Sequence, residues 1–147
     1  MSAETTLRLT RVPGIVAVKE ASGDMGQIQH ILDNRPKGFK VFSGNDDQTY
    51  PIMAAGGDGV ISVVSNIAPK PMLALTNALR SGDMETAKAL DKKLSGLYKA
   101  CFVECNPIPV KGGLAALGLC SDEMRLPLTP ATSATVKVMM DAYERVR

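Results

Sequence analysis

The residue best placed to do chemistry is Lys19, which ends the apolar run Gly14-Ile15-Val16-Ala17-Val18. The residues after it, Glu20-Ala21-Ser22-Gly23, are typical of a loop, so this amine is expected where a buried strand opens. A lysine amine attacks carbonyl carbons only when unprotonated, and partial desolvation at a strand end favours that form. The pattern predicts a Schiff-base lysine, although lysines also end strands simply to place a charge in water.

Composition restricts the class of protein around this lysine. The chain has 147 residues, of which 45% are hydrophobic and 22% charged, as expected of one globular domain. Its 17 basic and 15 acidic side chains give a net charge of +2 and are scattered along the chain. With three tyrosines, three phenylalanines and no tryptophan, little aromatic surface is left for stacking on bases. We therefore expect neither a nucleic-acid nor a membrane partner.

Residues that bind metals do not form a recognisable site. Cys101, Cys105 and Cys120 lack CxxC spacing, and the single histidine, His30, lies far from them in the sequence. We expect no metal ion, and we expect Cys101 and Cys105 to pack as small apolar groups in a reducing compartment. The N-terminus has no signal-peptide pattern and no run is long enough to cross a membrane, which predicts a cytoplasmic protein.

Short apolar runs alternate with helical stripes over residues 1–82. We expect strands over residues 15–19, 39–43 and 60–64, followed by helices that begin near Asp24, near Tyr50 and at Pro69. The strands are continuously apolar, which is typical of a parallel sheet whose strands are buried on both faces. The fold class predicted is α/β.

Strand patterns stop at Asp83. A long amphipathic helix is expected from Asp83 to Cys101, a break at Asn106-Pro107-Ile108-Pro109, and shorter helices over 114–117 and from Pro130. We therefore predict two parts, a strand-helix part over 1–82 and a helical extension over 83–147 packed on it. Since three strands leave two unpaired edges and cannot close a barrel, we expect the chain to belong to something larger or to associate.

Five stretches resemble the dihydrodipicolinate synthase family, within the N-acetylneuraminate lyase and class I aldolase superfamily. They are Gly14 to Gly23, Phe42-Ser43-Gly44-Asn45-Asp46, Gly56-Gly57-Asp58-Gly59-Val60-Ile61-Ser62-Val63, Asn106-Pro107-Ile108-Pro109-Val110-Lys111 and Leu126-Pro127-Leu128-Thr129-Pro130. The resemblance extends from Glu4 to the C-terminus. It implies a TIM (β/α)8 barrel of roughly twice this length, with active groups at the C-terminal ends of its strands. This chain would supply the last three strand-helix units and additional C-terminal helices.

The resemblance also implies a function and three site residues. In the family, a lysine matching Lys19 forms an imine with pyruvate, whose enamine adds to aspartate semialdehyde in lysine (diaminopimelate) biosynthesis. Ile61 matches the position whose backbone carbonyl faces the keto acid, and Gly44 permits close backbone approach to the same space. From the residues alone, Ile61 is typical of a strand core and Gly44 of a turn. No cofactor is implied.

The chain departs from the family where the proton relay is concerned. By resemblance, the relay tyrosine, the paired hydroxyl residues and the carboxylate-binding arginine belong to the first half of the barrel, which this chain does not match. Tyr50, Tyr98 and Tyr143 lie in expected helices and match no catalytic position. Activity of the chain alone is therefore left open. The partners implied are pyruvate, an aldehyde, and either further copies of the chain or a complementing N-terminal half-barrel.

Two alternative functions remain open. A related keto-acid or sialic acid aldolase would share the Schiff-base lysine but accept another aldehyde, and a non-catalytic half-barrel scaffold would need no relay. Two motifs are predicted to be structural: Asn45-Asp46-Asp47 as an exposed helix N-cap rather than a cation site, and Gly56-Gly57-Asp58-Gly59 as a helix-ending turn rather than a phosphate loop. Glu20 is expected on the opposite side of its strand from Lys19.

Overall fold

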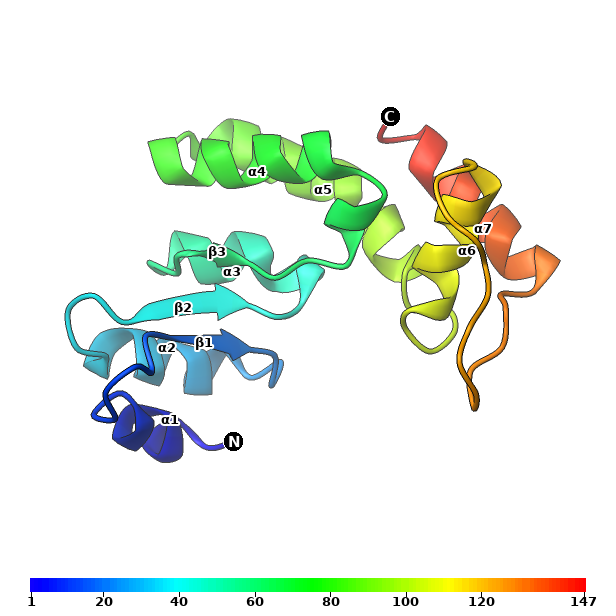
Figure 1. The fold of residues 1–147 in the computed structure, drawn as a ribbon. Helices are drawn as coiled ribbons and strands as arrows, with labels where there is room; N and C mark the ends of the chain where they lie inside the picture. Colours follow the sequence, from blue (N-terminus) through cyan, green and yellow to red (C-terminus); the bar gives the residue numbers. More distant parts are fainter.

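Three short parallel strands form the sheet, in a computed structural model that describes residues 1–147. They are β1 (Ala17–Glu20), β2 (Lys40–Ser43) and β3 (Gly59–Val60), hydrogen-bonded in the order β1-β2-β3. In Figure 1 the arrowheads of β1 and β2 point toward the end of the molecule where α6 and α7 lie. The α/β class with a parallel sheet, predicted from continuously apolar runs, is confirmed.

Seven α-helices and two 3₁₀ turns make up the rest of the ordered elements. They are α1 (Ala3–Leu9), α2 (Met25–Asn34), η1 (Asp46–Gln48), α3 (Thr49–Ala54), η2 (Val64–Asn66), α4 (Pro69–Ser81), α5 (Met84–Ala100), α6 (Ile108–Ala116) and α7 (Ser133–Glu144). Helices α1 and α2 pack together beside β1, whereas α4 and α5 run side by side beyond α3 and β3 (Figure 1). None of these helices combines the length and the apolar character that crossing a bilayer requires.

The helices cover only one face of the sheet. Val41 and Ser43 have no exposed surface and Glu20 is 5% exposed, because these side chains point toward the helices. Lys19 pairs in register with Phe42 on the other face, where Lys19 is exposed and Phe42 is partly exposed. The prediction that each strand is buried on both faces is therefore wrong for this chain. The predicted placement of Glu20 opposite Lys19 is confirmed.

The third strand is shorter than the expected strand over 60–64. Backbone pairing continues to Ile61, whose N–H donates to the Ser43 carbonyl at 2.8 Å, and the chain then turns into η2. The turn occurs because the Asp46 carboxylate accepts hydrogen bonds from the N–H groups of Val63 and Val64. The branched apolar residues over 60–64 favour a strand, but the contact with Asp46, from the loop after β2, ends the strand early.

Local capping signals predict most helix starts correctly. Asp24 caps α2 by accepting from the Gly26 N–H at 2.8 Å and the Gln27 N–H at 3.1 Å, and Asp83 caps α5 by accepting from Thr86 N–H at 3.1 Å. The expected break between helices is present, over residues 101–107, but it does not extend to Pro109. Helix α6 begins at Ile108, because a proline in the first helical turn has no hydrogen bond to lose. The expected starts of the last two helices are therefore wrong: the helix expected over 114–117 begins six residues earlier, and the one expected from Pro130 begins at Ser133. Helix α1 was not expected from the sequence.

The main hydrophobic core joins both predicted parts of the chain. Its 17 buried residues come from α3, η2 and α4 on one side of residue 82 and from α5, α6, α7 and the chain end on the other. Cys101 lies in this core with no exposed surface, as predicted, and burial followed by the charge of Asp46 raises the pKa of its thiol to about 12. Cys105 is exposed, so its predicted apolar packing is wrong. It follows α5, which ends at Ala100.

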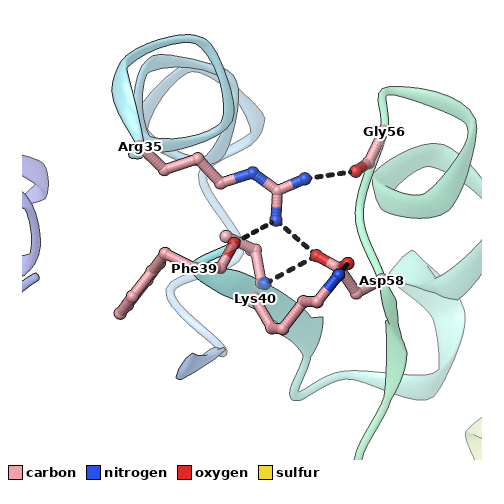
Figure 2. A network of polar contacts seen from close by, with 6 residues as sticks. Arg35, Phe39, Lys40, Gly56 and Asp58 are labelled. Atoms are coloured by element: carbon pink, nitrogen blue, oxygen red, sulfur yellow. Dashed lines mark hydrogen bonds and ion pairs between the residues drawn. The ribbon is translucent and has the colours of Figure 1, made fainter. Parts of the chain in front are cut away.

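An ion-pair network ties the amino ends of β2 and β3 together (Figure 2). Asp58 pairs with Arg35 and with Lys40 at 2.8 Å, and its Oδ2 accepts from the Val41 N–H at 2.9 Å. Arg35 also donates to the carbonyls of Phe39 at 2.9 Å and Gly56 at 2.8 Å. Partial burial opposes ionisation of Asp58, but these hydrogen bonds outweigh it and hold the pKa of the carboxyl at about 2. The turn at residues 56–59 is structural, as predicted.

Candidate active-site edge

The three residues singled out in the sequence lie at the carboxyl ends of the three strands. Lys19 is the last residue but one of β1, Gly44 follows β2, and Ile61 follows β3. The backbone connects them directly, because Gly44 N–H donates to the Glu20 carbonyl at 2.7 Å and Ile61 N–H donates to the Ser43 carbonyl at 2.8 Å. Parallel strands bring their carboxyl ends to one edge, and the structure therefore places all three positions on that edge.

Gly44 lies directly beside the Lys19 side chain. A Cβ atom built on Gly44 would lie 3.0 Å from Lys19 Cε, 2.6 Å from Ala21 Cβ and 3.1 Å from the Glu20 carbonyl oxygen. A separation of 2.6 Å between carbon atoms is far inside van der Waals contact, so only glycine fits here. The prediction that this glycine permits a close approach agrees with the geometry, and the group approached is the aliphatic stem of Lys19.

The desolvation expected around Lys19 is not provided by this chain. The side chain is exposed, and none of the principal pockets is lined by Lys19, Gly44 or Ile61. The reason is architectural: Lys19 projects from the sheet face that no helix covers, and β1 is an edge strand. A water-poor environment for this amine requires further chain packed against that face.

Ile61 differs from the strand-core residue that its type suggests. Its side chain is 49% exposed, and it follows the last residue of β3. The Ile61 N–H is bonded to Ser43, whereas its carbonyl accepts no hydrogen bond within the chain. An unpaired carbonyl at the carboxyl edge of the sheet is available to another group.

Two buried polar side chains brace the loops that leave this edge. Glu20 Oε1 accepts from the Ser22 N–H at 2.7 Å, and Ser43 Oγ donates to the Asn45 carbonyl at 2.7 Å. Both lie on the helix-covered face, with 5% and 0% exposure. They fix the directions in which the chain leaves β1 and β2, which is how Lys19 and Gly44 come to face the same space.

Asp46 is the residue of the site region whose role the sequence did not predict. It is 2% exposed rather than at an exposed cap, and the N-cap of η1 is Asn45, which makes no side-chain capping bond. Its carboxylate accepts from Ser62 Oγ and from the N–H groups of Val63 at 2.9 Å and Val64 at 3.2 Å. The prediction of an exposed N-cap is wrong because the carboxylate caps η2, a distant 3₁₀ turn, instead of its own. No sequence signal near Asp46 specifies that partner.

A hollow of about 390 Å³ lies behind this loop, between residues 45–47 and α5. Tyr98 and Lys99 of α5 line it, and the Tyr98 hydroxyl donates to Asp91 Oδ1 at 3.1 Å. Burial raises the pKa of Tyr98, and the Asp91, Asp46 and Asp47 carboxylates raise it further. The Tyr98 hydroxyl is thus bonded to a residue of its own helix and not to the sheet edge.

The other tyrosines and the potential metal ligands add no catalytic group at the edge. Tyr50 lies in α3 and Tyr143 in α7, and both pack against the main core. No group of three or more histidine, cysteine, aspartate or glutamate side chains is placed to hold a metal ion.

Nearly the whole chain, including this edge, is similar in sequence to known proteins. Residues 1–145 match the sequence profile of the Dihydrodipicolinate synthetase family. The chain is 49% identical over 132 residues to 4-hydroxy-tetrahydrodipicolinate synthase of Moorella thermoacetica, covering 90% of this chain and 45% of that protein. Its identity to the synthase of Thermotoga neapolitana is 46% over 140 residues, covering 92% and 48%.

Solved structures give the same result for the fold. The crystal structure of dihydrodipicolinate synthase from Thermotoga maritima matches with a TM-score of 0.94 and 42% identity, covering 98% of this chain and 50% of that chain. The chloride-inhibited synthase from Acinetobacter baumannii, complexed with pyruvate, matches with a TM-score of 0.93 and 36% identity, covering 99% and 50%. The chain therefore spans about half the length of the relatives it matches.

Proposed function

The chain belongs to the dihydrodipicolinate synthetase family, and from that premise we propose that it carries the Schiff-base half of a pyruvate-dependent lyase. The proposed reaction condenses pyruvate with aspartate semialdehyde. The observation that carries the proposal is the position of Lys19, at the carboxyl end of β1 on the uncovered face of the sheet and directly beside Gly44. This is where a barrel of this architecture holds its catalytic groups.

The chemistry proposed for Lys19 is covalent catalysis. Its unprotonated Nζ attacks the ketone carbon of pyruvate, and loss of water from the adduct leaves a protonated imine. The positive nitrogen then acidifies the methyl group, so that loss of a proton gives an enamine. The enamine carbon adds to the aldehyde carbon of the second substrate, and hydrolysis of the imine would return the free amine. Ile61 would present its unpaired carbonyl, and Gly44 its open backbone, to the bound keto acid.

The uncovered sheet face is proposed to be completed by further chain. In this proposal residues 1–82 form the last three strand-helix units of a (β/α)8 barrel, and residues 83–147 are the helical extension packed on it. The unpaired edges of β1 and β3 would then pair with strands of that further chain. That packing would desolvate Lys19 and supply the proton relay. It would come from a complementing half-barrel or from association of copies, and we propose a cytoplasmic location.

Trapping with borohydride tests this proposal. The chain is incubated with pyruvate and borohydride, alone and with the separately produced half of the Moorella thermoacetica relative that the chain does not match. We expect a reduced pyruvate adduct at Lys19, found by mass spectrometry, and a higher yield in the complemented sample because the imine forms from a desolvated amine. Lys19→Arg keeps the charge and should give no adduct.

Two results would contradict the proposal. One is a complex of the two halves, detected by size-exclusion chromatography, that yields no adduct at Lys19. The other is a chain that binds no complementary half and forms no adduct by itself. Synthesis is measured separately, in a coupled assay with aspartate semialdehyde, and the same assay with N-acetylmannosamine tests the related sialic acid aldolase.

A non-catalytic scaffold is the second candidate function, and one observation favours it. The Lys19 amine is exposed, and no tyrosine of this chain is placed to relay protons to it. A scaffold would bind the complementary half and yet leave Lys19 unmodified under trapping conditions. The same experiment therefore separates the two candidates.

A further inference from the structure

We propose that Asp46 is a positioning residue that fixes the Ile61 carbonyl for the keto acid. This inference rests on the proposed function and adds to it a group that does not itself touch the substrate. Asp46 follows β2, and the loop it holds follows β3, so the contact crosses between two of the three strand ends that form the candidate site. The distance in sequence is 17 residues from Asp46 to Val63.

The hydrogen bonds of Asp46 account for both carboxylate oxygens. Oδ1 accepts from Ser62 Oγ, and Oδ2 accepts from the N–H groups of Val63 at 2.9 Å and Val64 at 3.2 Å. Ser62 Oγ in turn accepts from the Ser65 N–H at 2.8 Å. All of these partners lie in the residues immediately after Ile61, so the carboxylate holds the loop in one conformation.

Ile61 is thereby fixed from both sides. Its own N–H is bonded to the Ser43 carbonyl at 2.8 Å, and the next residue, Ser62, is bonded to Asp46. With the N–H and the following residue both held, the peptide plane that carries the Ile61 carbonyl has little freedom to rotate. A carbonyl that is fixed before substrate arrives needs no reorganisation to bind it.

Burial makes the Asp46 contact strong. The side chain is 2% exposed, and none of the ion pairs of the chain includes it, so the loop donors alone compensate its charge. An ionised carboxylate removed from water depends heavily on such donors, and charge-assisted bonds are about twice as strong as neutral ones. A loop conformation that withdrew these donors would leave this charge unpaired.

Helix α5 lies beside the turn that carries Asp46. Tyr98 and Asp46 line the same hollow, and the charge of Asp46 contributes to the raised pKa of Tyr98 and of Cys101 at the end of α5. The helical extension therefore packs close to the residue that holds the Ile61 loop. This gives residues 83–147 a physical connection to the candidate site through packing rather than through a catalytic group.

The test replaces Asp46 with a side chain of the same shape. Asp46→Asn removes the charge and exchanges one acceptor for a donor that faces the loop donors. Asp47→Asn is the matched control, because Asp47 is the exposed neighbour and its side chain makes no hydrogen bond in the structure. Each variant is trapped with borohydride over a range of pyruvate concentrations, in the complemented sample described above.

We expect Asp46→Asn to raise the half-saturating pyruvate concentration roughly tenfold, with the adduct yield at saturation changed less than twofold. Asp47→Asn should match the wild-type chain in both the half-saturating pyruvate concentration and the adduct yield at saturation. A purely structural role would instead lower the saturating yield, through a smaller folded fraction, and leave half-saturation unchanged. That result would overturn the inference. Wild-type chain that forms no adduct would overturn the proposed function itself, and this inference with it.

A second variant covers the possibility that Asp46→Asn does not fold, which circular dichroism would reveal. Ser62→Ala removes the hydroxyl donor and leaves the two N–H donors to Asp46 in place. We expect it to fold and to raise half-saturation roughly threefold. An unchanged half-saturating concentration in Ser62→Ala, with wild-type chain trapping normally, would overturn the inference.

Discussion

Asp58 illustrates how a single side chain can hold the sheet at the end opposite the candidate site. It accepts hydrogen bonds from Arg35, Lys40 and the Val41 N–H, which come from a loop and from a neighbouring strand (Figure 2). In this architecture the amino ends of the strands serve stability and the carboxyl ends serve chemistry. The Asp58 network lies at the amino ends of β2 and β3, opposite the edge proposed for the chemistry.

At the residue scale, we predict that Asp58→Asn lowers the free energy of unfolding at pH 7 by about 2 kcal/mol, since the pKa falls from 3.8 to about 2 and each unit corresponds to 1.36 kcal/mol. Because the folded-state pKa is depressed, this stability is present above about pH 3.8 and is lost as the pH falls toward 2. Urea unfolding of both chains between pH 2 and 7 measures it.

Asp141→Asn is the control for this measurement. Asp141 pairs with Lys137 one helical turn away, but both side chains are largely exposed. An exposed pair of this kind contributes at most about 0.5 kcal/mol. If Asp58→Asn and Asp141→Asn were to cost the same at pH 7, the network at the amino ends would not stabilise the fold as described.

At the element scale, the ends of helices and the ends of strands are set by different interactions. Helices α2 and α5 begin at aspartates that bond N–H groups two or three residues ahead. Strand β3 ends where Asp46, a residue from another loop, bonds the chain. The residue directly after β2 must be a glycine, because there is no space for a Cβ atom at Gly44.

Replacing glycine by alanine is expected to have opposite effects on stability at a strand end and inside a helix. We predict that Gly44→Ala destabilises the chain by about 1 to 3 kcal/mol, because its Cβ would lie 2.6 Å from Ala21 Cβ and the backbone must move. Gly96→Ala, inside α5 with no atom within 4 Å of the new Cβ, should instead stabilise it by about 0.5 to 1 kcal/mol. Thermal unfolding followed by circular dichroism compares the two.

The glycine comparison also bears on the site. In Gly44→Ala the new methyl group would lie 3.0 Å from Lys19 Cε, so the lysine stem must shift as well. An unchanged melting temperature in Gly44→Ala would show that the carboxyl edge is less tightly packed than the structure indicates.

At the scale of the whole molecule, the three-stranded sheet has two open edges. Strands β1 and β3 each have one unpaired edge, and the face that carries Lys19 is uncovered. Val16, immediately before β1, and Ile61, immediately after β3, are 69% and 49% exposed. Unpaired edges beside exposed apolar side chains favour association with other chain.

We predict that the isolated chain self-associates at micromolar to millimolar concentration, and that Val16→Lys weakens the association by roughly fivefold or more in dissociation constant, because a charge beside the edge strand opposes pairing. Sedimentation velocity measures both. Val138→Lys is the control, since Val138 is 44% exposed on α7, which packs against α5 and α6. Equal weakening by both substitutions would place the association surface elsewhere, and the complementary half should compete with self-association.

The sequence by itself determined what depends on neighbouring residues. The caps at Asp24 and Asp83, the α/β class and the position of Lys19 at a strand end are all set within a few residues, by local hydrogen bonds and by apolar periodicity. The family resemblance added Gly44 and Ile61, which the structure brings to the same edge. No local pattern would have selected them.

Only the tertiary structure decided which surfaces are buried and where long-range contacts act. The exposure of Lys19, the early end of β3 and the buried role of Asp46 depend on partners far away in sequence, or on the absence of a covering layer within this chain. A continuously apolar strand indicates that both faces suit burial. It does not show whether this chain supplies the layers that bury them. Burial is a property of the assembled layers, and this chain provides a cover for only one face of its sheet.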